Sequence, residues 1–321
     1  MPVSLSAVPP HPEDCRLSEF AAAVLEGLSS SPRALPCRFF YDARGSELFE
    51  AITRLPEYYL TRAETAILEG GAEDLLASVE PGATLIEFGS GSSRKTELLL
   101  GSGRFAVYTP IDVSSTALAD AAARLRRRFP ALAITPLVAD FTADLRLTGA
   151  CGTAPAVGFF PGSTIGNFNP WDARALLRRM GALLGPDGRL VIGVDLRKDR
   201  ERLIAAYNDA AGVTAAFNLN LLARMRRDLD ARVDLDAFAH RTLYNETLGR
   251  IEMHLVSLAP QRIDVAGQSF AFAAGETIHT ESSYKHTPEG FAALAAAAGW
   301  RTRRILTDDE KLFAVMLLET D

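Results

Sequence analysis

The segment Ala83-Thr84-Leu85-Ile86-Glu87-Phe88-Gly89-Ser90-Gly91 decides the fold. Its first six residues are mostly apolar, as in a buried strand, and the two glycines predict a tight turn directly after it. A helical pattern follows from Arg94 to Leu100. The segment therefore predicts a strand, a glycine turn and a helix, which is how a Rossmann-like sheet begins.

Apolar runs and helical stretches continue to alternate after this turn. We expect strands at 105–111, 134–138, 156–160 and 189–194, and helices that include 117–129 and 171–184. This alternation predicts an α/β fold, with a parallel sheet covered by helices on both faces. Two further strands, at 301–306 and 313–318, are separated by a short turn. Such a hairpin is typical of the class I methyltransferase variant of the fold.

Changes in the alternation of predicted strands and helices along the chain predict the domains. Residues 1–16 contain four prolines and no apolar period, so we expect a flexible tail. Helices are expected at 18–28 and 61–79, and residues 17–198 and 282–321 form the main domain. Between 199 and 281 a long helical stretch through Arg226 precedes strands at 250–258 and 269–272. We interpret 199–281 as an inserted, smaller α+β domain that binds the substrate.

Composition narrows the class of ligand. The net charge of −6 offers no basic surface for nucleic acid, so a small-molecule substrate is expected. Apolar runs such as 291–300 are shorter than the roughly 20 residues that span a bilayer, and no secretory signal pattern begins the chain. We expect a cytoplasmic monomer without membrane contact. Cys15, Cys37 and Cys151 lack metal-ligand spacing and are expected to be reduced thiols, with no metal site.

The glycine turn also discriminates between cofactors. A dinucleotide site needs Gly-x-Gly-x-x-Gly, but Arg94 stands where the third glycine belongs. A nicotinamide dehydrogenase is therefore disfavoured. Glu87, two residues before Gly89, suits a cofactor that carries a cationic amino acid group and no phosphate. S-adenosylmethionine fits that description.

Two later strand ends support the same cofactor. Asp112 follows Gly89 by about 20 residues, the spacing expected of an acid that binds ribose hydroxyls. Asp140 can accept a hydrogen bond from an adenine amino group, and Phe141 can cover the adenine ring. Each feature has an ordinary alternative, because acids after strands often cap helices and Phe141 can be a core residue. Their order and spacing together favour the cofactor site.

Three longer motifs carry a family resemblance. They are Arg54-Leu55-Pro56-Glu57-Tyr58-Tyr59-x-Thr61-Arg62, Gly162-Ser163-Thr164-Ile165-Gly166-Asn167 and Asp209-Ala210-Ala211-Gly212-Val213-Thr214-Ala215-Ala216-Phe217-Asn218. Through them the chain resembles, nearly end to end, the histidine-specific N-alpha-methyltransferases of ergothioneine biosynthesis. Members of that family convert L-histidine to hercynine by three methyl transfers from S-adenosylmethionine, which becomes S-adenosylhomocysteine. The resemblance implies the same reaction here.

The resemblance also implies roles for individual residues. Tyr58 and Tyr207 match positions that bind the amino acid's backbone groups. Gly162 to Asn167 follow the fourth predicted strand, beside the cofactor, so Asn167 could donate a hydrogen bond to a substrate α-carboxylate. Glu281 and Ser283 match the pocket for the imidazole ring, with Met253 as its apolar wall. Tyr41 and Lys95 match positions near the methionine end of the cofactor. Isolated tyrosines and a strand methionine would otherwise be read as packing residues, and Asn167 as a loop amide.

Methyl transfer requires a neutral amine aligned with the sulfonium methyl group, and it requires no metal ion. We expect catalysis by positioning, with Tyr58 and water able to relay the amine's protons. The spacing of His240, His254, His279 and His286 shows no metal pair. Two alternatives remain open: methylation of another amino acid's α-amine, and a non-catalytic S-adenosylmethionine-binding protein. The second would be expected to lack Tyr58, Asn167 and Tyr207.

Overall fold

The computed structural model describes residues 12–143, 145 and 156–320, although no side chain is described before residue 19. The chain divides into two compact units. We call the larger one, Thr53–Ala206, Tyr244–Ile251 and Ser282–Asp321, the sheet unit. The other, Met1–Ile52, Tyr207–Leu243 and Glu252–Glu281, is called the small unit.

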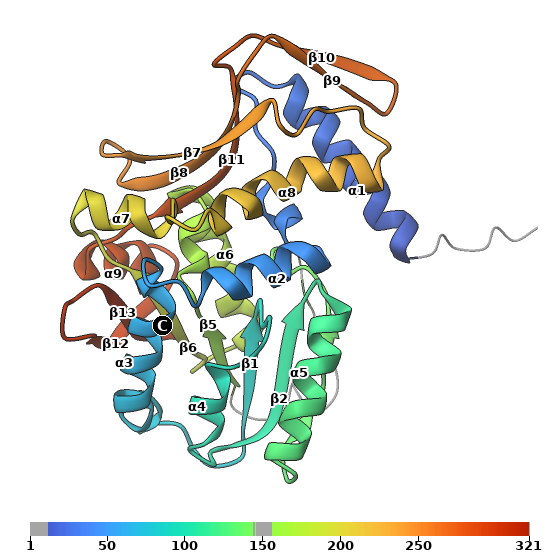
Figure 1. Cartoon of the computed structure of the whole chain (residues 1–321). Coiled ribbons are helices and arrows are strands. Elements are labelled where there is room, and N and C mark those ends of the chain that lie inside the picture. The colour runs from blue at the N-terminus through green and yellow to red at the C-terminus, as the bar shows by residue number, and fades with distance from the viewer. Residues whose placement is uncertain (1–11, 144, 146–155, 321) are drawn as a thin grey trace, which may run out of the picture. The chain divides into compact units, whose positions relative to one another are not determined.

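The sheet unit contains one twisted, mainly parallel sheet, which can be followed in Figure 1. The strand order is β12-β13-β6-β5-β1-β2-β3, with β4 also paired to β2. β13 pairs antiparallel with both β6 and β12, whereas β6, β5, β1 and β2 run parallel. The bounds are β1 Ala83–Phe88, β2 Phe105–Asp112, β3 Ala133–Ile134, β4 Leu137–Val138, β5 Ala156–Phe160, β6 Arg189–Asp195, β12 Trp300–Thr307 and β13 Phe313–Thr320.

This arrangement confirms the α/β class and the C-terminal hairpin. The strand expected over 134–138 is the exception, because it consists of two separate two-residue strands on β2. Pro136 lies between them and cannot donate a ladder hydrogen bond, so the strand is interrupted there.

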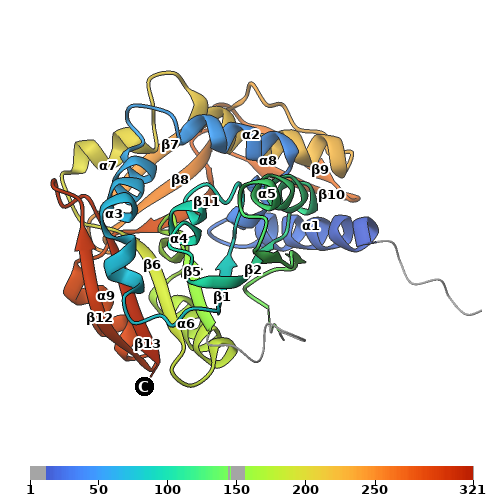
Figure 2. The ribbon, with the colours of Figure 1, turned by 90° about the horizontal axis from the view of Figure 1, so that it is seen from below.

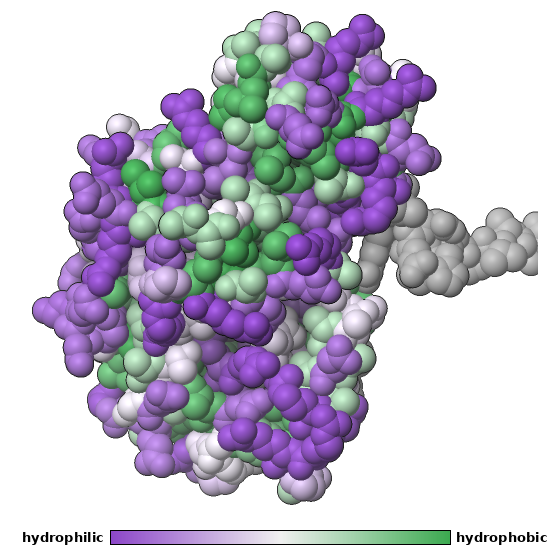
Figure 3. All heavy atoms as spheres, in the orientation of Figure 1, coloured by the Kyte–Doolittle hydropathy of each residue, from purple (hydrophilic) through white to green (hydrophobic). Residues whose placement is uncertain are grey.

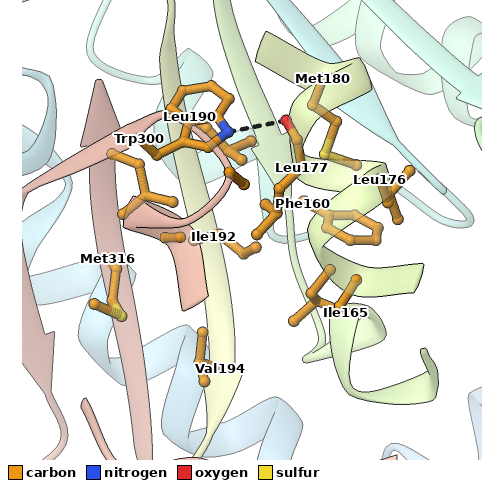
Figure 4. Packing of buried hydrophobic residues seen from close by; sticks show 14 of the residues in the cluster. Phe160, Ile165, Leu176, Leu177, Met180, Leu190, Ile192, Val194, Trp300 and Met316 are labelled. Atoms are coloured by element: carbon orange, nitrogen blue, oxygen red, sulfur yellow. Dashed lines mark hydrogen bonds between the residues drawn. The ribbon is translucent and has the colours of Figure 1, made fainter. Parts of the chain in front are cut away.

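Helices cover both faces of the sheet, as Figure 2 shows. One face carries α3 (Tyr59–Leu76), α4 (Thr96–Leu100) and α5 (Ser115–Arg128), and the other carries α6 (Pro170–Leu184) and α9 (Pro288–Ala296). Between the second pair and the sheet lies an apolar core drawn in Figure 4. The indole Nε1 of Trp300 donates to the Leu177 carbonyl at 2.9 Å, so the largest core side chain also satisfies its polar atom.

The small unit is assembled from three segments of the chain. It contains α1 (Pro12–Ser29), η1 (Cys37–Phe40), α2 (Ala43–Ile52), α8 (Val213–Asp228), β9 (Gln261–Val265) and β10 (Gln268–Phe272). A three-stranded sheet in the order β11-β8-β7 also contributes to it, from β7 Phe238–Asn245, β8 Arg250–Ser257 and β11 Thr277–Tyr284. Phe40 stacks on Phe217 of α8 with ring centroids 4.5 Å apart, which joins the N-terminal segment to the middle one.

Several boundaries differ from the sequence-based expectation. The first helix begins at Pro12 rather than near Leu17, while residues 1–11 of the expected tail lie outside the described residues. The long helical stretch through Arg226 is two helices, α7 (Arg200–Ala206) and α8, because Gly212 has a φ of 72° and caps the second one. The small unit also includes residues up to Ile52, which the sequence pattern had assigned to the main domain.

The thiols and the surface complete the description. Cys37 is a free thiol, whereas Cys151 and the side chain of Cys15 lie outside the described residues. Hydrophilic side chains cover much of the face in Figure 3, in keeping with a chain in which 23% of residues are charged. Within the described ranges, no helix combines the length and the apolar character needed to cross a membrane.

Candidate active site

A buried acid lies near the carboxyl end of the central strand β1. Glu87 is 1% exposed and accepts a short hydrogen bond from the Tyr108 hydroxyl. Tyr108, on the neighbouring strand β2, also lies 2.8 Å from the Ser93 hydroxyl. Burial raises the pKa of Glu87 to about 7, although the Tyr108 hydrogen bond and the Lys95 charge act in the opposite direction. A cation placed beside Glu87 would therefore stabilise its ionised form.

The glycine turn follows directly. Gly89 and Gly91 have φ values of 70° and 48°, a conformation that glycine adopts at little steric cost. The Gly91 amide donates to one carboxylate oxygen of Asp112 at 2.9 Å, and the Ser114 amide donates to the other at 2.9 Å. Because β1 and β2 are parallel neighbours, Asp112 reaches the turn at the same edge of the sheet. The predicted cofactor turn and the predicted ribose acid are in direct contact.

The predicted adenine residues lie beside this turn. A Cβ atom added to Gly89 would come within 3.2 Å of the Phe141 ring, so the glycine lets the backbone and the ring approach closely. The Phe141 ring centroid is 5.4 Å from that of Phe160, and the side chain is only partly buried. Asp140 accepts from the amide and hydroxyl of Thr142 through one oxygen, at 2.7 and 2.6 Å. These bonds form a local turn, so Asp140 is not the helix cap that the sequence left as its alternative.

A second buried acid holds the loop that begins at Gly162. Glu64, on α3, is fully buried and forms a short ion pair with Lys95. Its two oxygens accept from the Gly162 amide at 3.0 and 2.9 Å. A Cβ atom at Gly193 would lie 2.1 Å from the Glu64 carboxylate, so the glycine in the middle of β6 leaves the room that this acid occupies. Lys95 and Gly162, predicted for cofactor and substrate respectively, share one carboxylate.

Tyr58 lies at the start of α3 and is 8% exposed. The preceding turn is held by Arg62, whose guanidinium donates to the carbonyls of Leu55, Pro56 and Tyr58 at 2.7, 2.6 and 3.2 Å. This explains why the motif carries an arginine four residues after the tyrosine. The Arg62 side chain stabilises this turn and so fixes the backbone of Tyr58.

Asn167 and Ser283 also belong to the sheet unit. Asn167 is partly buried and ends the 3-10 helix η3 (Thr164–Asn167), which follows β5. Ser283 lies on β11, is 3% exposed and accepts from the Lys285 ammonium group at 2.8 Å. Tyr58, Gly162, Asn167 and Ser283 are thus the predicted substrate residues of this unit.

The small unit holds the other predicted residues, Tyr41, Tyr207, Met253 and Glu281. Tyr207, Met253 and Glu281 are 6%, 2% and 8% exposed, and Glu281 lies on β11. Burial and the Glu281 charge together raise the pKa of the Cys37 thiol to about 12, so this cysteine stays protonated at neutral pH.

Tyr41 and Tyr207 are held by different means. Tyr41 packs edge-on against Phe49 and Phe217, with centroid distances of 5.6 and 5.7 Å. The Tyr207 carbonyl lies 2.9 Å from Nε2 of His240 and accepts from the Thr242 hydroxyl at 2.7 Å. Burial lowers the pKa of His240, which keeps its ring neutral and places it in a supporting role.

Four polar residues that the sequence analysis missed are buried in the sheet unit: Glu64, Tyr108, Asp195 and Lys285. Asp195 ends β6, so the signal used for Asp112 and Asp140, an acid at a strand's carboxyl end, was available for it. Glu64 and Tyr108 sit among apolar neighbours and resemble packing residues in the sequence. Among the described residues, no group of three or more histidine, cysteine or acidic side chains is placed to hold a metal ion.

The strand order, the antiparallel β13 and the glycine turn beside two acids define the class of S-adenosylmethionine-dependent methyltransferases with a Rossmann-like sheet. Residues 20–320 match the family of histidine-specific, S-adenosylmethionine-dependent methyltransferases, and the chain belongs to that family. It is 43% identical over 305 residues to the histidine N-alpha-methyltransferase of Mycolicibacterium smegmatis, covering 92% of each chain.

Two further relatives agree with this assignment. The histidine N-alpha-methyltransferase of Mycobacterium tuberculosis is 40% identical over 300 residues, again with 92% of each chain covered. Ergothioneine biosynthesis protein 1 of Neurospora crassa is 32% identical over 277 residues, which cover 84% of this chain and 31% of that protein.

Proposed function

We propose that the protein transfers three methyl groups from S-adenosylmethionine to the α-amine of L-histidine and so forms hercynine, a step of ergothioneine biosynthesis. The observation that carries the proposal is the family match over residues 20–320. The reaction needs a cofactor site and a separate site for an amino acid, and residues suited to each are buried or partly buried in the structure.

The cofactor, when bound, supplies a methyl group on a sulfonium centre. We assign its amino acid end to Glu87, Lys95 and Tyr41, and its ribose to Asp112. Asp140 and Phe141 would hold the adenine, and Gly89 and Gly91 would let the backbone approach it. The support from this chain is the raised pKa of the buried Glu87, which favours an adjacent cation, and the narrow space between Gly89 and the Phe141 ring.

The substrate assignments follow the family match. Tyr58, Asn167 and Tyr207 would bind the α-amino and α-carboxylate groups, and Gly162 would shape the loop that presents Asn167. Glu281 and Ser283 would bind the imidazole, with Met253 against its apolar face. A buried carboxylate discriminates well, because an amino acid without a ring N–H would leave the Glu281 carboxylate buried and without that bond.

Chemistry then depends on alignment and on a neutral amine. Tyr58 is the residue to which we assign the proton relay, since a phenol can both accept and donate a hydrogen bond. Its backbone is fixed by the Arg62 bonds to the turn before it, which would limit its movement between the three transfers. We propose that no metal ion takes part and that the enzyme acts as a cytoplasmic monomer.

The direct experiment incubates the purified protein with S-adenosylmethionine and each amino acid singly, and follows mass gains. We expect histidine to gain three methyl groups. Methylation of another amino acid in place of histidine would select the alternative substrate, and S-adenosylmethionine binding without any transfer would select a non-catalytic role. Addition of a chelator should leave the rate unchanged, and light scattering of the eluted protein would report the mass of one chain.

A second experiment tests the ring pocket. Glu281→Ala should reduce kcat/KM for histidine at least tenfold and weaken the preference for histidine over other amino acids. Glu246→Ala, at a side chain that is 74% exposed, is the matched control and should change neither. An unchanged preference for histidine in Glu281→Ala would rule out the role assigned to that carboxylate.

A further inference from the structure

A buried charged cluster lies within the sheet unit, and the proposed chemistry does not use it. It consists of Asp195 and Lys285, which are buried, and Lys198, whose side chain is 7% exposed. Asp195 accepts from Lys285 at 2.7 Å and from the Tyr59 hydroxyl at 2.9 Å through each oxygen. Lys198 bonds to the same carboxylate and donates to Tyr59 at 2.6 Å. Two ammonium groups thus share one carboxylate away from solvent.

Such a cluster is costly for stability alone. Removing charged groups from water carries a penalty of several kcal/mol each, and a well-packed apolar replacement is often as stable. Burial by itself raises the pKa of Asp195, but the charges of Lys285 and Lys198 lower it below its usual value, so the acid stays ionised. Burial also lowers the pKa of Lys198 to about 8, although the charge of Asp195 acts in the opposite direction.

The contacts of the cluster lead to three chain segments that carry predicted substrate residues. The Asp195 amide donates to the Ser163 hydroxyl at 2.9 Å, in the loop that ends at Asn167. The Lys285 ammonium group donates to Ser283 at 2.8 Å. The third segment is the start of α3, where Tyr59 directly follows Tyr58.

The Gly162–Asn167 loop needs such support, because its backbone is strained. Ser163 has a φ of 57°, in the left-handed region that residues other than glycine rarely adopt. The loop also packs tightly against β11, since a Cβ atom at Gly166 would lie 2.8 Å from the Tyr284 carbonyl oxygen. A hydrogen bond from the Asp195 amide to the Ser163 side chain holds this conformation beside the cluster.

We propose that Asp195 and Lys285 are positioning residues for the amino acid substrate: their buried ion pair fixes Ser283 and the start of α3, and the Asp195 backbone amide holds the Gly162–Asn167 loop. The proposal rests on the function proposed above. Lys285 acts through its hydrogen bond to Ser283. The cofactor turn has no hydrogen bond to the cluster among the contacts described, so cofactor affinity is expected to be independent of it.

The test is a double-mutant cycle on the full-length protein, with Lys285→Met, Ser283→Ala and the double variant. Lys285→Met should raise KM for histidine at least tenfold and change the Kd for S-adenosylmethionine less than threefold. Lys285→Met in the Ser283→Ala background should have little additional effect on kcat/KM. The Ser283 hydroxyl, through which Lys285 acts on the substrate, is already absent there.

Lys198→Met is the matched control: it removes one ammonium group from Asp195 and Tyr59 but leaves the Lys285–Ser283 bond and the Tyr59–Asp195 bonds in place. Its KM for histidine should rise less than threefold. If the methionine variant does not fold, Lys285→Gln, which keeps a polar head group near Ser283, replaces it. The same two quantities are then measured, the KM for histidine and the Kd for S-adenosylmethionine.

The outcomes separate the two proposals. A wild-type protein that does not methylate histidine would overturn the proposed function. A wild-type protein that does so, with additive effects of Lys285 and Ser283 or an unchanged KM in the Lys285 variants, would overturn only the positioning role. Equal losses of histidine and cofactor binding would also overturn it, because they would indicate a general structural contribution.

Discussion

The two acid-containing regions of the sheet unit differ in what neutralises their charge. Glu87, near the end of β1, receives its hydrogen bond from a phenol, and its pKa is raised to about 7. Asp195, at the end of β6, is held by two lysines, and its pKa is lowered. The difference teaches that burial alone does not mark a ligand site. Glu87, which forms no ion pair within the part of the chain that the structure describes, is suited to receive a cationic ligand, whereas the paired Asp195 organises its surroundings.

Removal of the paired charge should have the largest effect. Asp195→Asn leaves two buried lysines without their anion, so we expect the free energy of unfolding to fall by about 3–5 kcal/mol. Denaturant unfolding at pH 7 measures this loss. Asp120→Asn, at an exposed position on α5, is the control and should change stability by less than about 0.5 kcal/mol. A loss no larger than the control's would mean that the lysines do not depend on Asp195.

Substitution of Glu87 is expected to raise the free energy of unfolding, whereas substitution of Asp195 lowers it. In the folded protein its pKa is about 7, against 4.5 as its ordinary value, so the folded state holds more protons between these two pH values. Stability from this group is therefore complete below pH 4.5 and is lost as the pH rises to about 7. Glu87→Gln should escape that loss and gain up to about 3 kcal/mol relative to the wild type across the window.

The measurement for Glu87 is denaturant unfolding of both proteins at half-unit steps from pH 4.5 to pH 8. If the free energies of unfolding of the two proteins change with pH in parallel over this range, Glu87 titrates normally. The proposed contrast with Asp195 would then disappear.

Cofactor binding should show a smaller change. If Glu87 binds the amino group of S-adenosylmethionine, Glu87→Gln should weaken the Kd about tenfold, which corresponds to about 1.4 kcal/mol. Wild-type binding should tighten as the pH rises from 6 to 7.5 and should release a proton, because the bound cation lowers the pKa of Glu87. Calorimetry in two buffers of different ionisation enthalpy detects that proton, and its absence would assign Glu87 to a structural role with Tyr108.

Asp112→Asn should have the smallest effect. The asparagine can still accept from the Gly91 amide, but its NH₂ group cannot accept from the Ser114 amide. We expect S-adenosylmethionine to bind about threefold more weakly, a difference below about 1 kcal/mol. Titration calorimetry provides the value, and a loss of a hundredfold or more would place Asp112 above Glu87 in importance for the cofactor.

The sequence predicts the sheet better than the support around its site. Strand β1, the glycine turn and Asp112 are local features, because each depends on a short pattern and on the direction of parallel strands. Pro136 could have predicted the break in the strand over 134–138, but the apolar residues on both sides of it favoured one continuous strand. The start of the small unit before Ile52 was not visible, since α2 packs on α8 from a segment far along the chain.

The supporting residues were missed for a related reason. Glu64 contacts Lys95 and Gly162, which lie 31 and 98 residues away, and no local pattern joins these positions. Lys285 is two residues after Ser283 on the same alternation, yet a lysine at the end of a strand is normally exposed. Its complete burial follows only from the position of Asp195 in the folded sheet.

The place of β13 in the sheet has a consequence for how the protein is made. This strand lies between β6 and β12, yet it is synthesised roughly 120 residues after β6, at about 5–20 residues per second. The edge of β6 that β13 later covers thus stays open on the growing chain for several seconds. A slow ribosome or a chain shortened before Phe313 would leave this apolar edge able to pair with another chain. Translation speed is therefore expected to influence the yield of folded enzyme as well as its rate of production.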